Sequence, residues 1–154
     1  MSTIYFHGED VDVPDFIDEK DISHWLKTIA EIEGQEIGEL NYVFCSDSYL
    51  LEINKQYLQH DYYTDIITFD YSEAGVLSGD VFISVERVRE NADHFQANFE
   101  VELCRVIAHG CLHLIGYADK SAEQQKLMTM KEEASLSLYQ KLSVPRGTPG
   151  ESPK

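Results

Sequence analysis

The order in which strand and helix patterns follow one another constrains the fold of this chain more than any other feature. Stretches rich in β-branched and aromatic residues, which predict strands, lie in the first part of the sequence, at residues 2–6, 39–45, 64–71 and 79–85. From Arg87 onward, apolar residues recur at helical spacing. Because strands come early and helices late, we predict an α+β fold in which a small mixed four-stranded sheet packs against several helices.

Helical patterns also occur between the strands, and several have clear ends. The first helical segment begins at Asp15 or Asp18 and ends before Gly34. The others lie at about residues 48–58, 86–98, 99–116 and 121–142. Asp47 is the predicted N-cap of the second segment. Gly116 closes the fourth, where a glycine with positive φ can end a helix. Ser121 with Gln124 predicts a capping box at the start of the last segment.

The length of 154 residues fits one domain, and a domain of this size buries about 68–70% of its unfolded surface. With 43% hydrophobic residues the chain can build a core without disulfides or a structural metal. A bound metal would therefore serve function rather than folding. We predict a single domain over residues 1–142. Residues 143–154 are rich in Pro, Gly and Ser, and we expect them to form a disordered tail.

Cysteine usage and the N-terminal sequence indicate the compartment. Cys45, Cys104 and Cys111 are odd in number, lack CxxC spacing and lie in apolar runs, as expected for reduced core residues of a cytosolic protein. The first residues lack the basic and apolar regions of a signal peptide, and no apolar run is long enough to cross a bilayer. We therefore predict a cytoplasmic protein with no membrane partner.

The charge limits the classes of partner. Twenty-eight acidic residues against twelve basic ones give a formal net charge of −16. Such a field repels phosphate backbones, and nucleic-acid binders normally carry a basic stripe. For most of these residues the simplest interpretation is a solvated acidic surface. The charge therefore argues against RNA binding unless a local basic patch exists.

The segment HGCLHLIGYAD, residues 109–119, contains a potential metal site. His109 and His113 are four residues apart and share one helix face, and neutral imidazoles suit zinc. After Gly116 breaks the helix, Asp119 can turn back toward the same point. Two histidines at this spacing also occur as ordinary polar residues of a helix. The helix-ending glycine and the third donor favour a site with three protein ligands, which is typical of catalytic zinc.

This spacing also matches the metzincin protease motif with one change. In those proteases a glutamate follows the first histidine and acts as general base. Here that position is Gly110, which has no side chain. A peptidase interpretation would need a carboxylate from elsewhere in the chain.

Three separated motifs resemble the YbeY family of bacterial metal-dependent endoribonucleases. HGCLHLIGY at 109–117 is similar to the family signature HGxLHLxGYDH. INKQYLQHDYYTDIITFD at 53–70 resembles its LNxxYRxxDxxTDVLSFP segment, and GDVFIS at 79–84 resembles its GDIxIS strand. The resemblance covers about residues 39–142, and three motifs in the same order are more specific than one.

The resemblance implies a zinc-dependent endoribonuclease specific for single strands. It further implies a role in late ribosome assembly, in maturation of the 3′ end of small-subunit (16S) ribosomal RNA, and in ribosome quality control. The expected partners are ribosomal RNA and proteins of the small ribosomal subunit. His109 and His113 match two of the family's three metal-binding histidines.

The sequence departs from the family pattern at the third ligand. Asp119 stands where the family has a histidine. The resemblance implies one zinc ion per chain. Because a carboxylate is a harder donor than imidazole, we expect the site to tolerate manganese or magnesium as well.

A second departure concerns the family's YR pair, whose arginine is Leu58 here. Leucine offers a phosphate no hydrogen bond, so another cation is needed. His60, two residues on, is either a phosphate donor or, as a simpler interpretation, a solvated loop histidine. The other candidates are Lys55, Arg87, Arg89, Arg105 and Lys120. We assign Arg105 the catalytic role because it lies four residues before His109, on the same helical stripe. Its alternative is a surface pair with Glu102 or Glu100.

Two other functions remain open at this stage. One is a metal-dependent hydrolase of another substrate, including peptides. The other is a ribosome-associated factor that binds metal but does not cleave. Asp65 and Asp80 are the carboxylates nearest the family motifs, and we assign neither of them the role of general base.

Overall fold

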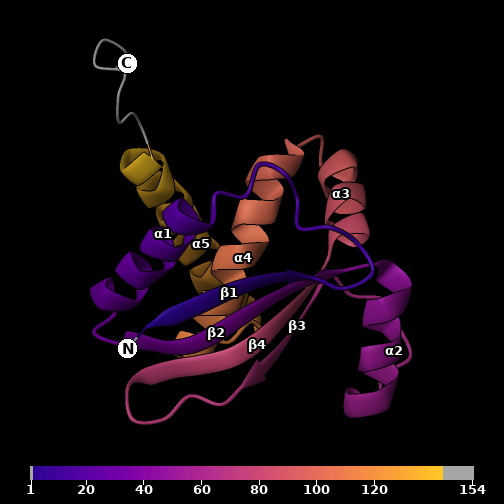
Figure 1. Ribbon diagram of the computed structural model, residues 1–154, viewed down its shortest axis with the longest axis horizontal. Helices are drawn as coiled ribbons and strands as arrows, with labels where there is room; N and C mark the ends of the chain where they lie inside the picture. Colours follow the sequence, from indigo (N-terminus) through magenta and orange to yellow (C-terminus); the bar gives the residue numbers. More distant parts are fainter. Residues whose placement is uncertain (1, 144–154) are drawn as a thin grey trace.

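A four-stranded mixed sheet forms the centre of the fold (Figure 1). The computed structural model describes residues 2–143. The strands are β1 (Thr3–Gly8), β2 (Glu36–Cys45), β3 (Ile66–Asp70) and β4 (Val76–Ser84). They are ordered β1-β2-β4-β3, with β1, β2 and β4 parallel to one another and β3 antiparallel to β4. The predicted mixed sheet is therefore confirmed.

Helices cover the two faces of the sheet unequally (Figure 1). The helices are α1 (Glu19–Ile32), α2 (Asp47–Leu58), α3 (Val85–His94), α4 (Phe99–Ile115) and α5 (Ala122–Ser143). One face packs on the main core, to which α1, α4 and α5 contribute. The other face carries a smaller cluster with α2. This arrangement confirms the predicted α+β class.

Helix α4 lies at the centre of the main core. Strand alternation sends Leu40, Tyr42 and Phe44 of β2 toward this core, and all three are fully buried. Gly110 of α4 faces Val81 of β4, and a Cβ at Gly110 would lie only 2.8 Å from the Val81 Cγ1 atom. The missing side chain therefore lets the histidine-bearing helix pack closely against the sheet.

Most predicted helix ends are confirmed. Gly116 has φ of 127° and follows α4 directly. The Ser121 and Gln124 side chains each accept a hydrogen bond from the other residue's backbone N–H, both at 3.1 Å, which completes the predicted capping box.

The prediction that Asp47 caps α2 was wrong. Ser46 is the N-cap, because its hydroxyl accepts the Tyr49 backbone N–H at 3.1 Å. The Asp47 carboxylate instead pairs with the Arg87 guanidinium at 2.6 Å. Aspartate and serine both suit an N-cap, and this long-range pair explains why serine takes the position.

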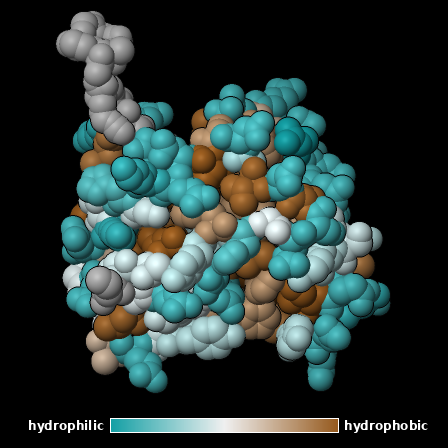
Figure 2. Space-filling view, viewed as in Figure 1, coloured by the Kyte–Doolittle hydropathy of each residue, from teal (hydrophilic) through white to brown (hydrophobic). Residues whose placement is uncertain are grey.

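Cys45, Cys104 and Cys111 are buried free thiols, as predicted. Within residues 2–143 no helix combines the length and apolarity needed to cross a membrane. The face in Figure 2 is largely hydrophilic, with apolar side chains in separate patches. Ser143 is the last residue of α5, and the rest of the predicted tail, 144–154, lies outside the described residues.

Candidate metal centre

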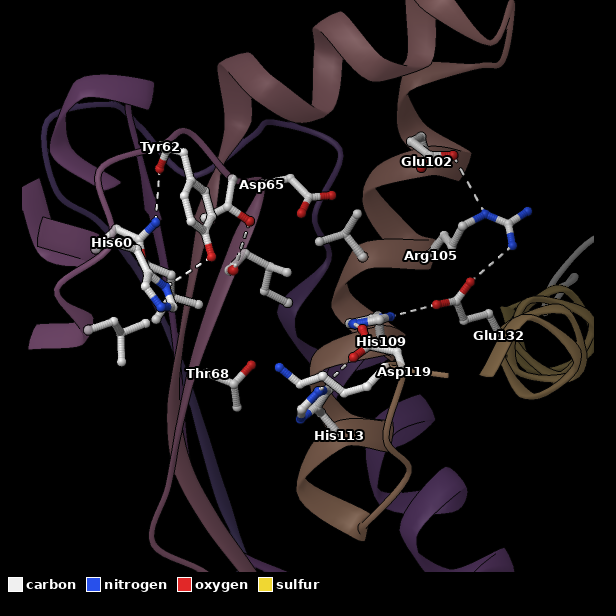
Figure 3. A pocket seen from close by; sticks show the side chains of 17 residues that line it. His60, Tyr62, Asp65, Thr68, Glu102, Arg105, His109, His113, Asp119 and Glu132 are labelled. Carbon is white, nitrogen blue, oxygen red and sulfur yellow. Dashed lines mark hydrogen bonds and ion pairs between the residues drawn. The ribbon is translucent and has the colours of Figure 1, made fainter. Parts of the chain in front are cut away.

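His109, His113 and Asp119 converge at one end of α4 (Figure 3). One donor atom from each lies within 4.8 Å of the other two. The His109 Nε2 atom is 3.3 Å from Asp119 Oδ2, and the His113 Nε2 atom is 3.7 Å from Asp119 Oδ1. The structure therefore brings together the three residues that the spacing selected.

Local structure explains why Asp119 reaches the histidines. His109 and His113 are one turn apart on α4, and their ring centroids are 5.7 Å apart. The positive φ of Gly116 turns the chain back at the helix end. The Asp119 carbonyl then accepts a hydrogen bond from the Gln125 side chain at 3.1 Å, which ties the segment to the start of α5. Asp119 is thus held between two helices.

Glu132 of α5 also belongs to this centre, although the sequence pattern did not predict it. Its Oε2 atom accepts a hydrogen bond from His109 Nδ1 at 2.6 Å, and the residue is only 8% exposed. This contact leaves Nε2 as the His109 nitrogen that faces Asp119. Burial lowers the pKa of His109, but the hydrogen bond and charge of Glu132, with Asp119 and Asp65, outweigh burial and raise it. In the sequence, Glu132 is one of two adjacent glutamates in the last helical segment, and no spacing links it to the histidines.

Arg105 lies one turn before His109 and is surrounded by carboxylates (Figure 3). Its guanidinium is 2.7 Å from Glu133, 3.4 Å from Glu132 and 3.5 Å from Glu102. The predicted alternative pair with Glu102 is therefore present. Burial raises the pKa of Glu102, although the nearby Arg105 charge opposes this effect. Arg105 links Glu132, and through it His109, to neighbouring acids of α4 and α5.

A cavity of about 580 Å³ opens beside the three donors, within the usual range for small-molecule sites of about 300–1,000 Å³. It has two sides (Figure 3). The helix wall comes from α4, α5 and the segment between them, and consists of Glu102, Arg105, Val106, His109, His113, Asp119, Lys120 and Glu132. The loop wall comes from the end of α2, the following loop and β3, and consists of Asn54, Leu58, His60, Tyr62, Thr64, Asp65, Ile66, Ile67 and Thr68.

The cations proposed from the sequence are divided between the cavity and other contacts. Arg105 and Lys120 line the cavity. Lys120 is exposed and makes no ion pair with any residue of the described range 2–143. Arg87 pairs with Asp47 and Glu90, Lys55 pairs with Glu52 and Asp61, and Arg89 lies over the Phe99 ring.

The two carboxylates left without a role are also separated. Asp65 lies on the loop wall, and burial raises its pKa, although the nearby His109 charge opposes the shift. Asp80 lies on the opposite sheet face, where it accepts a hydrogen bond from Asn41 at 3.1 Å.

The donor set fits a divalent metal. Ligand atoms about 2.0–2.2 Å from a tetrahedral zinc ion lie roughly 3.3–3.6 Å from one another. The two histidine–aspartate distances, 3.3 and 3.7 Å, are close to this spacing. Glu132 adds the outer hydrogen bond that orients most metal-binding histidines. A metal held by these two imidazoles and one carboxylate would keep further coordination positions for water or substrate.

Comparisons with known proteins agree with the motifs. The family profile described as Endoribonuclease YbeY matches residues 3–140. A protein from Cytophaga hutchinsonii named Endoribonuclease YbeY is 52% identical over 137 residues, covering 88% of this chain and 95% of that protein. A protein of the same name from Parabacteroides distasonis is 47% identical over 135 residues, covering 88% and 94%.

A solved structure has a similar fold. The solution structure of a protein from Thermotoga maritima superposes with a TM-score of 0.67 and 27% sequence identity. The match covers 97% of this chain and all of that one.

Proposed function

The chain belongs to the YbeY endoribonuclease family, and we propose that it is a zinc-dependent enzyme that cleaves single-stranded RNA during late ribosome assembly. The observation that carries this proposal is the convergence of His109, His113 and Asp119 at one cavity. We further propose the 3′ end of small-subunit ribosomal RNA as the substrate, with a role in ribosome quality control.

His109, His113 and Asp119 would hold the metal. When bound, the metal supplies a Lewis acid that stabilises charge on the phosphoryl oxygens and lowers the pKa of a coordinated water. The mixed donor set suits zinc and also accommodates manganese or magnesium, because the Asp119 carboxylate is a harder donor than imidazole.

The protein's own side chains prepare this site. The Glu132 carboxylate accepts a hydrogen bond from His109 Nδ1–H and so favours the tautomer whose Nε2 faces Asp119. Arg105 is the proposed catalytic cation, since it lines the cavity one turn from His109. Its three carboxylate partners offset much of its charge, so it acts by fixing Glu132 as well as by facing the substrate. Lys120 is a second cation available to a phosphate.

A peptidase function is disfavoured by the position after the first histidine. Gly110 is buried against Val81 and Ile66, so even a longer side chain there would point into the core rather than the cavity. The acidic surface supports a further part of the proposal, namely docking on basic proteins of the small ribosomal subunit in the cytoplasm.

The deciding experiment is cleavage of a labelled single-stranded RNA by purified protein loaded with zinc or manganese, with a chelator-treated sample and a His109→Ala/His113→Ala variant as controls. We expect cleavage that the chelator abolishes and the variant lacks, and no hydrolysis of a labelled peptide. Ribosome binding with intact RNA under both metals would instead support the non-catalytic function.

A further inference from the structure

We propose that the paired rings of His60 and Tyr62 form a nucleobase-binding subsite on the loop wall, opposite the metal ligands. This inference rests on the proposed function, because it assigns the position of a substrate base in the same cavity. Both residues line the cavity, and Figure 3 shows them across it from His109, His113 and Asp119.

The two rings form one aromatic unit. Their centroids are 5.0 Å apart and their planes differ by 19°, as in stacked rings. The Tyr62 hydroxyl and His60 Nδ1 are hydrogen-bonded at 2.9 Å. Tyr62 is 56% exposed, so much of its aromatic surface is open to a ligand. A large exposed ring that is already stacked on one partner is suited to continue the stack with a flat base.

A buried side chain holds this unit in place. Asn54 is only 2% exposed, and its Nδ2 atom donates a hydrogen bond to the Tyr62 carbonyl at 2.9 Å. The Asn54 carbonyl accepts the His60 backbone N–H at 3.0 Å. Gln59, between α2 and His60, takes a left-handed conformation with φ of 58°. The loop is thus fastened to α2 on both sides of the ring pair, which lowers the entropic cost of presenting the rings to a ligand.

The electrostatics of the chain make such a subsite useful. The net charge of −16 repels a phosphate backbone, and Leu58, which also lines the cavity, offers a phosphate no donor. Stacking on an aromatic ring does not depend on phosphate charge, and every base has a π-face, so it tolerates any sequence. The loop wall therefore supplies affinity for an unpaired base, while the helix wall carries the chemistry.

The test measures how strongly the affinity for an RNA-like oligomer depends on its nucleobases. Two fluorescent 2′-O-methyl oligomers of equal length are compared by anisotropy with the metal-loaded protein, one of adenylates and one abasic, and gels verify that both stay intact. Their phosphate number is the same, so the ratio of the abasic Kd to the adenylate Kd reports base contacts alone. We expect a ratio of at least about five for the unmodified protein.

We expect the ratio to fall toward one in Tyr62→Leu and to persist in Tyr62→Phe, which keeps the ring. The matched control is Tyr63→Leu, because Tyr63 is 52% exposed but faces the Arg87 guanidinium at 5.0 Å rather than the cavity. A ratio near one in the unmodified protein, or an unchanged ratio in Tyr62→Leu, overturns the subsite. The binding assay needs no cleavage, so a loss of base dependence in Tyr62→Leu supports the subsite even if the RNA cleavage assay fails. If the protein cleaves RNA but the ratio is unchanged in Tyr62→Leu, the subsite is rejected and the proposed function stands.

Discussion

The helix wall and the loop wall of the cavity differ in charge and in how they are built. The helix wall carries all the lysine and arginine side chains of the cavity and most of its carboxylates, and it stands on α4, whose opposite side packs in the main core. The loop wall has a single carboxylate, Asp65, no lysine or arginine, and otherwise polar, apolar and aromatic groups around the end of α2. The proposed chemistry and the proposed substrate contacts are therefore separated onto different elements.

This difference corresponds to the pattern of resemblance and departure in the sequence. On the helix wall, His109 and His113 match two histidines of the signature that the sequence resembles, and Asp119 stands at the position of its third. The loop wall has lost the family arginine, which is Leu58 here, and places His60 and Tyr62 beside it. We infer that the proposed chemistry uses positions that match the family signature, whereas the proposed substrate contacts use positions that depart from it.

The largest effect is expected from removing the histidines of the helix wall. The His109→Ala/His113→Ala variant should cleave single-stranded RNA at least about 100-fold more slowly, because metal catalysis supplies several kcal/mol of transition-state stabilisation. Initial rates on a labelled RNA, with circular dichroism as a check of folding, measure this. The core lies outside the site, so the variant should remain folded. A folded variant with the rate of the unmodified protein would place the chemistry elsewhere.

The next effect comes from Glu132, behind the histidines. Glu132→Ala should weaken metal affinity by about 10- to 100-fold, because His109 loses the acceptor for its Nδ1 proton. Glu132→Gln keeps an acceptor oxygen and should recover part of the affinity. The matched control is Glu133→Ala, since Glu133 contacts Arg105 but not His109. Competition titrations with a chromogenic chelator measure the affinities, and equal values in all three variants would exclude an orienting role.

The close packing behind the helix wall gives a third test. Gly110→Glu should lower the free energy of unfolding by at least about 2 kcal/mol, because it forces a charged side chain against buried Val81. Val101→Glu, at an exposed position of the same helix, should change it little. Urea denaturation measures both variants. Gly110→Glu with unaltered stability, or with new peptide hydrolysis, would contradict the packing argument against a peptidase.

The smallest effect is expected on the loop wall. Leu58→Arg should increase the RNA cleavage rate roughly two- to fivefold, because one exposed phosphate contact contributes less than about 1 kcal/mol. It should also make the slope of log K for RNA binding against log salt concentration steeper by about one unit, because it adds one phosphate contact. Leu127→Arg, which adds the same charge at an exposed position outside the cavity, serves as the control. A rate increase of the same size in both variants would indicate a general charge effect.

The sequence predicted the helix wall better than the loop wall for a physical reason. The His109, His113, Gly116 and Asp119 spacing acts within one helix turn and one chain reversal, so local geometry alone brings the donors together. Glu132 contacts His109 across 23 residues, and only the packing of α5 on α4 creates that contact.

The loop wall depends on side-chain and backbone contacts that the spacing of apolar residues in the sequence does not predict. The aromatic pair exists because Asn54 fixes the loop on both sides and Gln59 takes a left-handed conformation. His60 was considered as a phosphate donor or a solvated loop residue, and its stacking on Tyr62 was not anticipated. The order of strands and helices was predictable because alternation and helical spacing are local, whereas the choice of Ser46 over Asp47 as N-cap depended on a distant partner, Arg87.

The most direct test of the central claim is an anomalous difference map at the zinc absorption edge, from crystals of the protein grown with zinc. The account predicts one strong peak per chain, about 2.0–2.2 Å from the Nε2 atoms of His109 and His113 and from a carboxylate oxygen of Asp119. A map whose strongest peak lies away from these three residues, or a chain with no peak at saturating zinc, would contradict it.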